Sequence, residues 1–329
     1  MSRSKARRQS EIVLAELTRK SEKGLEFAKG IILSEKIQYV KLHDAMEYYV
    51  SNWNDFTHPG LFATAYEAVG GDAHVAIPIQ AAVAMIGAAF DIHDDIIDKS
   101  KLKHGEPTVF GKFGEEIALL LGNAFLVGGF TLFGKSLDKF QKRAEVFEII
   151  KQSLYELGNA HALELSLRKR AYPGPEEYLE IVKMKAASIE GDMRIGAMIG
   201  GGTQEEIEAL ASYGRILGTL AILREEFVDV FDVGELNQRL SSEYLPIPVL
   251  YALQDTESKK KIEKLITKNI TERDINVLVD IVFETKEVEN LNRYAEKLVV
   301  NAFHTTSNIS NKDLRYQLES LAFSTLEDI

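Results

Sequence analysis

The acidic stretch Asp91-Ile-His-Asp-Asp-Ile-Ile-Asp98 directly follows ten residues, 81–90, that carry no charge at all. If this segment is helical, residues three and four apart share a face, so Asp91, Asp94 and Asp98 form one acidic stripe with Asp95 beside it. The uncharged run predicts a helix that is buried on most sides and that ends in carboxylates. Carboxylates at this spacing repel one another, and their clustered oxygens suit a hard divalent cation such as Mg2+. On charge alone, a solvated acidic helix end is the alternative.

A second acidic stretch, Arg224-Glu-Glu-Phe-Val-Asp-Val-Phe-Asp232, repeats this layout far downstream. It has two adjacent acids, an apolar pair and a further acid, so Glu225 and Asp229 also share a helical face. Two such helices facing each other would line a cavity with carboxylates. The repetition therefore favours a metal site over a solvated helix end.

Prolines are scarce, and this decides the fold class. The chain has seven in 329 residues, and the long segments between them are rich in Ala, Leu, Glu, Lys and Ile with helical periodicity. No glycine- or serine-rich linker divides the sequence. We therefore predict an all-α protein, a single large helical bundle over residues 10–329 with a central cavity lined by the two acidic helices, preceded by a basic, frayed tail at residues 1–9.

Several helices can be placed in advance. Residues 10–33 predict an amphipathic helix, residues 74–98 the buried helix with Pro78 near its first turns, and residues 176–200 another helix. Thr203 followed by Glu206 has the spacing of a capping box. The helix that Thr203 opens continues into the second acidic stretch, with Gly214 or Gly218 as places for a break.

Charge and composition narrow the class of partner. A net charge of -11 argues against nucleic acid, which requires a basic face. The absence of cysteine excludes disulfides and fits a reducing compartment. No uninterrupted apolar run reaches the ~18 residues of a membrane span, and the basic start is not followed by the apolar core of a signal peptide. We expect a cytoplasmic protein without a transmembrane span.

At this point the residues resemble a known family, the trans-polyprenyl diphosphate synthases or polyprenyl synthetases, over most of the chain. His93-Asp-Asp-Ile-Ile-Asp98 with the trailing Gly105-Glu-Pro-Thr108 is similar to the family's first aspartate-rich motif. Glu225-Glu-Phe-Val-Asp229 resembles the second motif with two glutamates in place of aspartates. Lys185-Ala-Ala-Ser188 is similar to the family's lysine-threonine motif, with alanine in place of threonine.

The resemblance implies a prenyltransferase of the isoprenoid synthase fold. Three Mg2+ ions between the two motifs would bind the diphosphate of an allylic prenyl substrate and neutralise the leaving pyrophosphate, after which isopentenyl diphosphate attacks the allylic cation. The family also implies a homodimer, with a heteromer as a further possibility.

The resemblance also assigns roles to single residues. Those expected to act in metal binding are Asp94, Asp95, Asp98, Glu225, Glu226 and Asp229. Lys103 and Lys185 would hold the allylic diphosphate, with Asp94, Asp98 and Lys185 as the catalytic set. Arg239, His58, His104 and Phe90 complete the substrate-binding set, Phe90 as the floor of the chain-length pocket. His93 has a simpler interpretation, local packing, because oxygen ligands already suffice.

Two departures fall on the isopentenyl side of the site. The family's glycine-lysine-x-x-arginine string corresponds to Trp53-Asn-Asp-Phe-Thr-His-Pro-Gly60, which has no lysine or arginine, and its paired arginines correspond to Lys103-His104. The isopentenyl half is then either eroded or rebuilt around His58 and His104, although a histidine before a proline is also a common turn residue. The alternatives are therefore a lyase or cyclase that ionises a preformed prenyl diphosphate, or a non-catalytic subunit of a heteromeric synthase.

Overall fold

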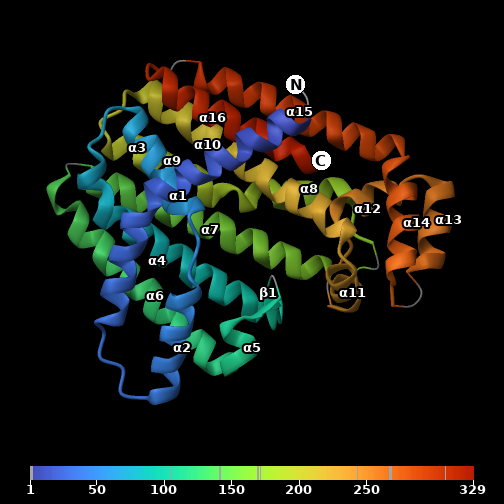
Figure 1. Ribbon diagram of the computed structural model, residues 1–329, viewed down its shortest axis with the longest axis horizontal. Helices are drawn as coiled ribbons and strands as arrows, with labels where there is room; N and C mark the ends of the chain where they lie inside the picture. The colour runs from blue at the N-terminus through green and yellow to red at the C-terminus, as the bar shows by residue number, and fades with distance from the viewer. Residues whose placement is uncertain are drawn as a thin grey trace. The chain divides into compact units, whose positions relative to one another are not determined.

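The computed structural model is almost entirely helical (Figure 1), which confirms the predicted all-α class. It describes residues 3–103, 105–140, 142–168, 170, 172–242, 244–266, 269–307 and 309–329. The elements are α1 (Arg3–Leu33), α2 (Val40–Asn52), α3 (Thr57–Ala68), α4 (Ala73–Ile97), β1 (Leu102–Lys103), β2 (Glu106–Pro107), α5 (Val109–Phe113), α6 (Glu115–Ser136), η1 (Leu137–Lys139), α7 (Arg143–Leu167), α8 (Pro175–Lys185), α9 (Ala187–Ile199), α10 (Gln204–Val228), η2 (Asp229–Phe231), α11 (Val233–Ser242), α12 (Ile247–Ala252), α13 (Thr256–Leu265), α14 (Glu272–Phe283), α15 (Lys286–Thr306), α16 (Lys312–Ser324) and η3 (Thr325–Asp328).

Contacts along the chain group into two compact units. The amino-terminal unit comprises Leu14–Phe147 and Asp192–Ile207, and the carboxyl-terminal unit comprises Met1–Val13, Glu148–Gly191 and Glu208–Ile329. The single domain expected from the sequence stays a prediction. Helix α1 begins at Arg3, seven residues before the predicted start at Ser10, because the residues in between are mostly good helix formers.

Helix α4 is the buried helix that the sequence predicted. The Asp72 side chain caps it by accepting from the His74 N–H at 2.9 Å, Pro78 lies within its second turn, and residues 79–86 are all buried. It ends at Ile97, with Asp98 as the C-cap. The sequence prediction placed both ends correctly to within one residue.

Close packing against α6 fixes the position of α4, and the two helices run side by side in the amino-terminal unit (Figure 1). A Cβ atom on Gly129 of α6 would lie 2.8 Å from Ile86 Cγ1 and 3.2 Å from the Ala82 carbonyl oxygen, so only glycine allows this approach. A Cβ on Gly122 would lie 2.5 Å from His93 Nε2. As expected from the sequence, His93 packs locally.

Both α4 and α6 are long and apolar enough to cross a membrane by length and composition. The apolar window of α4 is 67% buried within the protein, as in a core helix, whereas that of α6 is 39% buried. The burial of α4 therefore explains its apolar character. Part of the apolar surface of α6 has no cover within the described residues of this chain.

A helix break lies elsewhere than predicted. The segment expected to form one helix over residues 176–200 is divided at Ala186 into α8 and α9, whereas α10 is continuous through Gly214 and Gly218. Arg215 of α10 explains the difference, because its Nη1 donates to the Lys183 carbonyl at 2.8 Å, a carbonyl that the break leaves without its helical partner. Gly218 allows α10 to lie close to Ala186, since a Cβ atom at position 218 would lie 2.8 Å from Ala186 Cβ.

The start of α10 agrees with the sequence prediction. The Thr203 N–H donates to Glu206 Oε2 at 2.9 Å, and the Glu206 N–H donates to Thr203 Oγ1 at 3.3 Å. These two bonds form the predicted capping box. The helix then runs unbroken to Val228, so it carries the first residues of the second acidic stretch.

Candidate active site

The first acidic stretch lies at the carboxyl end of α4 in the amino-terminal unit. Asp91 is exposed, whereas Asp94, Asp95 and Asp98 are half-buried. The carbonyl groups that end a helix already carry partial negative charge, so carboxylates gathered there require a cation. The fold therefore concentrates negative charge at a fixed point.

The raised pKa of Asp95 follows from this accumulation of negative charge. Burial and the carboxylates of Asp91, Asp94 and Asp98 together raise the pKa of Asp95 to about 7, against the opposing charge of Lys103. Lys103 Nζ lies 3.9 Å from Asp91 Oδ1. A set of carboxylate oxygens with excess negative charge has the donor chemistry that Mg2+ prefers, so these residues fit the predicted metal.

Lys103 is held by a small hairpin. β1 and β2 pair antiparallel, Lys103 opposite Glu106, and the turn contains Gly105 with a φ of 82°. Thr108 closes the loop because its hydroxyl donates to the Ser100 carbonyl at 2.7 Å. The hairpin brings Lys103 to the acidic stretch, and its role in holding the allylic diphosphate stays a prediction. His104, the other predicted residue of this loop, lies outside the described residues.

Phe90 is half-buried on α4, one helical turn before Asp94. This is the place the sequence predicted for it. Its role at the floor of the substrate pocket stays a prediction.

His58 lies in the first turn of α3 and faces carboxylates. Its Nδ1 is 2.5 Å from Asp192 Oδ2 of α9. Asp55 precedes it and accepts from the Thr57 N–H at 2.9 Å. A Cβ on Gly87 of α4 would lie 3.6 Å from Asp55 Oδ2 and 3.7 Å from His58 Cδ2, so both side chains stand against α4 one turn before Asp91.

The charge of His58 follows from these neighbours. Burial by itself lowers the pKa of His58, but the carboxylates of Asp192, Asp55 and Asp91 outweigh it and raise the pKa to about 10. His58 is therefore an imidazolium at neutral pH, with its charge largely balanced by Asp192. Asp192 could not be identified as this partner in advance, because it is 134 residues away along the chain.

The second acidic stretch lies in the carboxyl-terminal unit, at the end of α10 and the start of η2. The Glu225 side chain is 63% exposed and pairs with Arg224 at 3.1 Å. Glu226 is buried, and its two oxygens accept from the Tyr178 hydroxyl at 2.6 Å, the Ile247 N–H at 2.8 Å and Arg239 Nη2 and Nη1 at 3.1 and 3.3 Å. Four donor groups already bind this carboxylate. A metal-binding role for Glu226 stays a prediction.

Arg239 of α11 is buried and belongs to the same cluster. Its guanidinium contacts the carboxylates of Glu226 and Asp229, and it donates to Glu235 at 3.2 Å. Burial raises the pKa of Asp229 to about 6, with Arg239 opposing the rise. Arg239 was predicted to bind substrate, and this role stays a prediction for a guanidinium that already contacts three carboxylates.

Lys185 ends α8 and pairs with the buried carboxylate of Glu164 from α7. The Tyr244 hydroxyl donates to the same carboxylate. Neither Glu164 nor Tyr178 was identified from the sequence. Neither residue lies in a recognisable sequence motif.

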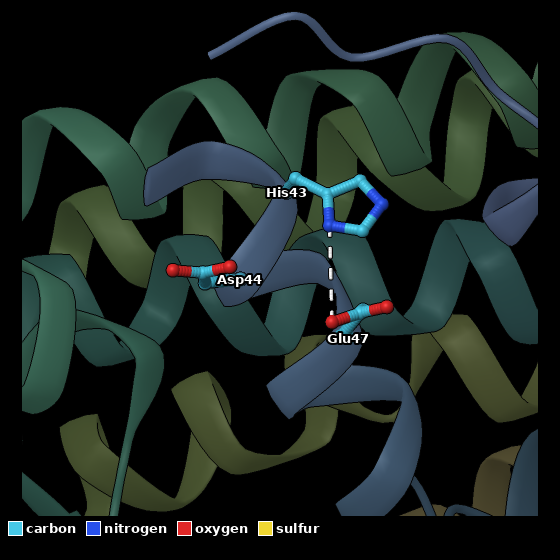
Figure 2. Close-up of side chains that lie close together, drawn as sticks. All are labelled: His43, Asp44 and Glu47. Carbon is cyan, nitrogen blue, oxygen red and sulfur yellow. Dashed lines mark ion pairs between the residues drawn. The ribbon is translucent and has the colours of Figure 1, made fainter. Parts of the chain in front are cut away.

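A separate group of possible ligands lies on the surface of α2. Figure 2 shows His43, Asp44 and Glu47, whose ligand atoms lie within 4.8 Å of one another. His43 Nδ1 and Glu47 Oε2 are 3.8 Å apart. This is the geometry of a surface pair one helical turn apart, which contributes a few tenths of a kcal/mol, about 0.2–0.5, to helix stability.

The polyprenyl synthetase family model matches residues 40–282. A short chain isoprenyl diphosphate synthase of Methanothermobacter thermautotrophicus is 30% identical over 229 residues, which are 68% of this chain and 70% of that protein. Its counterpart in Methanocaldococcus jannaschii is 28% identical over 291 residues, 86% and 88% of the two chains. Among solved structures, the geranylgeranyl pyrophosphate synthetase of Pyrococcus horikoshii superposes with a TM-score of 0.84 at 25% identity, covering 96% of this chain and 98% of that one.

The family recognised from the two acidic stretches is therefore confirmed by a sequence match over most of the chain and by the fold. The match extends well beyond the motifs themselves. The chain belongs to the polyprenyl synthetase family, whose members are prenyltransferases.

Proposed function

We propose that this protein is a Mg2+-dependent prenyltransferase that condenses an allylic prenyl diphosphate with isopentenyl diphosphate into a short-chain prenyl diphosphate. The observation that carries the proposal is the carboxylate cluster at the end of buried α4, with Lys103 beside Asp91. The names of the relatives, short chain isoprenyl and geranylgeranyl diphosphate synthases, support it. A cytoplasmic location and a homodimer are part of the same proposal.

The residues would act as follows. Asp94, Asp95 and Asp98, with Glu225 and Asp229 from the second motif, would hold Mg2+, three ions in all. When bound, the ions neutralise the charge that builds on the departing diphosphate. Lys103 and Lys185 hold diphosphate oxygens, and the low dielectric of a partly buried site strengthens each of these interactions. Glu226 supports the second motif through its bonds to Arg239, which in turn holds Asp229.

The bulk of an apolar side chain, Phe90, would set the length of the product. Phe90 stands one turn before Asp94 on the same helix face. A growing prenyl chain whose diphosphate is held at Asp94 would extend along α4 toward this ring. Phe90 would then limit elongation.

A second candidate function has its own observation. Asp55, Asp91 and Asp192 contribute three carboxylates around His58, and the charge of His58 is already engaged by Asp192. A second diphosphate needs surplus positive charge, and these side chains do not provide it. The cluster therefore favours a lyase that ionises one preformed prenyl diphosphate and uses no isopentenyl diphosphate.

One experiment separates these functions. The purified protein is incubated with Mg2+ and dimethylallyl, geranyl or farnesyl diphosphate, each with and without isopentenyl diphosphate, and products are identified by mass spectrometry. We expect elongated diphosphates that require isopentenyl diphosphate. Pyrophosphate release with hydrocarbon or alcohol products in its absence would support the lyase instead. No turnover of any substrate would indicate a non-catalytic subunit.

A further inference from the structure

A chain of contacts in the carboxyl-terminal unit joins Lys185 to the second acidic motif. Tyr244 and Ile247, three residues apart, bond to two different buried carboxylates. The Tyr244 hydroxyl donates to Glu164, which also binds Lys185, and the Ile247 N–H donates to Glu226 at 2.8 Å. The short segment 244–247 therefore holds both groups at once.

Aromatic packing completes the link. The rings of Tyr244 and Tyr178 meet edge to face with centroids 4.7 Å apart, and the Tyr178 hydroxyl donates to Glu226 at 2.6 Å. All four side chains, Tyr178, Tyr244, Glu164 and Glu226, are buried. Because the hydroxyls and carboxylates lie away from water, each bond is costly to break.

We propose that Tyr244 is a positioning residue for the prenyl transfer reaction: by sharing the Glu164 carboxylate with Lys185, it sets where the Lys185 ammonium stands relative to the second acidic motif. This inference rests on the proposed function, in which Lys185 holds the substrate diphosphate. Burial raises the pKa of the Tyr244 hydroxyl, and neighbouring Tyr178 and Glu164 raise it further, so Tyr244 stays a neutral donor throughout the working pH range.

The consequence of losing the hydroxyl follows from the geometry. Glu164 Oε1 accepts from Tyr244 and Oε2 binds Lys185. Without Tyr244 the buried Oε1 loses its donor, and the carboxylate charge acts more strongly on Lys185, which is nearer to Oε2 than His161 Nδ1 at 3.9 Å. Lys185 is then held more tightly by Glu164 and is less available to the diphosphate.

Tyr244→Phe is the direct test, since it removes the hydroxyl and keeps the ring against Tyr178. Calorimetry with inorganic pyrophosphate and Mg2+ measures the Kd, and we expect Tyr244→Phe to weaken it roughly fivefold, the size of effect that corresponds to the loss of one typical hydrogen bond. KM for the allylic diphosphate should rise similarly, with kcat within about twofold of the wild type. An unchanged Kd would overturn the proposal.

Tyr251→Phe is the matched control. Tyr251 is also a buried tyrosine, and its hydroxyl donates to a different carboxylate, Glu176, at 3.0 Å. We expect the wild-type Kd from this variant. If Tyr251→Phe weakens pyrophosphate binding as much as Tyr244→Phe, the effect is general loss of packing and the proposal fails.

Two further variants test the route through Lys185. In a Lys185→Met background, Tyr244→Phe should have no further effect on the Kd, and a full additional effect would contradict the proposal. Glu164→Asp keeps the charge but draws the carboxylate back by one methylene group, so Lys185 is held in a different position and binding should weaken even if Tyr244→Phe fails to fold; a wild-type Kd for Glu164→Asp would overturn the proposal. Pyrophosphate binding needs no turnover, so an inactive wild type would refute the proposed function without deciding this inference.

Discussion

His58 shows how a single residue can change the chemistry of a site. Three carboxylates, Asp192, Asp55 and Asp91, overcome the effect of burial and raise the pKa of His58 to about 10. His93, by contrast, has its pKa lowered, mainly by burial, with its bonds to the Leu119 carbonyl and Asn123 opposing. Two histidines of the same unit therefore carry different charges near neutral pH.

We expect NMR titration of the imidazole rings to show His58 still protonated at pH 8, with a midpoint near 10. Because the folded chain binds this proton more tightly than the unfolded chain, the stability that His58 contributes is complete below its ordinary pKa of 6.5 and is lost as pH rises through about 10. Asp192→Asn should lower the midpoint by removing the nearest carboxylate. A wild-type midpoint at or below 6.5 would contradict this account of the site.

At the scale of elements, glycine decides how closely α6 approaches α4. Gly129→Ala would place a methyl group 2.8 Å from Ile86 Cγ1, with the α4 backbone 3.2 Å away. We expect a loss of about 1–3 kcal/mol in the free energy of unfolding, the usual cost of overpacking, measured by urea denaturation.

Gly30→Ala on α1 is the control for this change. Its new Cβ would meet nothing within 4 Å, so the gain in helix propensity should leave stability unchanged or raise it by about 0.5–1 kcal/mol. Equal effects of the two substitutions would refute the close approach of α4 and α6.

The elements also show which features a sequence can reveal. Helix α4, the capping box of Thr203 and Glu206, and the acidic stripe all depend on residues within a few turns of one another, and each was predicted. The break at Ala186 was not predicted, because its cause is Arg215 on another helix, which binds the freed Lys183 carbonyl. Local periodicity carries no signal of a partner on a distant helix.

The same limit applies to the candidate site. The carboxylates at the end of α4 were found because their spacing is local. The pairing of His58 with Asp192 and the enclosure of Glu226 by Tyr178, Ile247 and Arg239 join residues 134, 48, 21 and 13 positions apart. These partners change what the predicted residues can do, and only the folded chain brings them together.

At the scale of the whole molecule, the exposed apolar side of α6 is relevant to whether two copies of the chain associate. Leu120 and Val127 are 53% and 66% exposed on the side of α6 opposite Gly129. Exposed apolar side chains on a helix that is only partly covered are typical of an interface between subunits. We expect a dimer in light scattering coupled to gel filtration.

Leu120→Glu should convert that dimer to a monomer, because it places a charge in the buried interface. Val300→Glu on α15 is the control, since Val300 is also 53% exposed and lies in the other unit. A monomeric wild type, or a Leu120→Glu variant that stays dimeric, would remove α6 as the contact face.

The measurement that tests the central claim most directly is Mg2+-dependent release of pyrophosphate from an allylic prenyl diphosphate, compared between the wild type and Asp94→Ala. Asp44→Ala, which removes an exposed aspartate from α2, serves as the control. The account predicts turnover by the wild type and by Asp44→Ala, and a loss of at least roughly a hundredfold in Asp94→Ala, the size of effect seen when a group that stabilises transition-state charge is removed. Unchanged turnover by Asp94→Ala would contradict it, because the carboxylates at the end of α4 would then not be the site where the diphosphate departs.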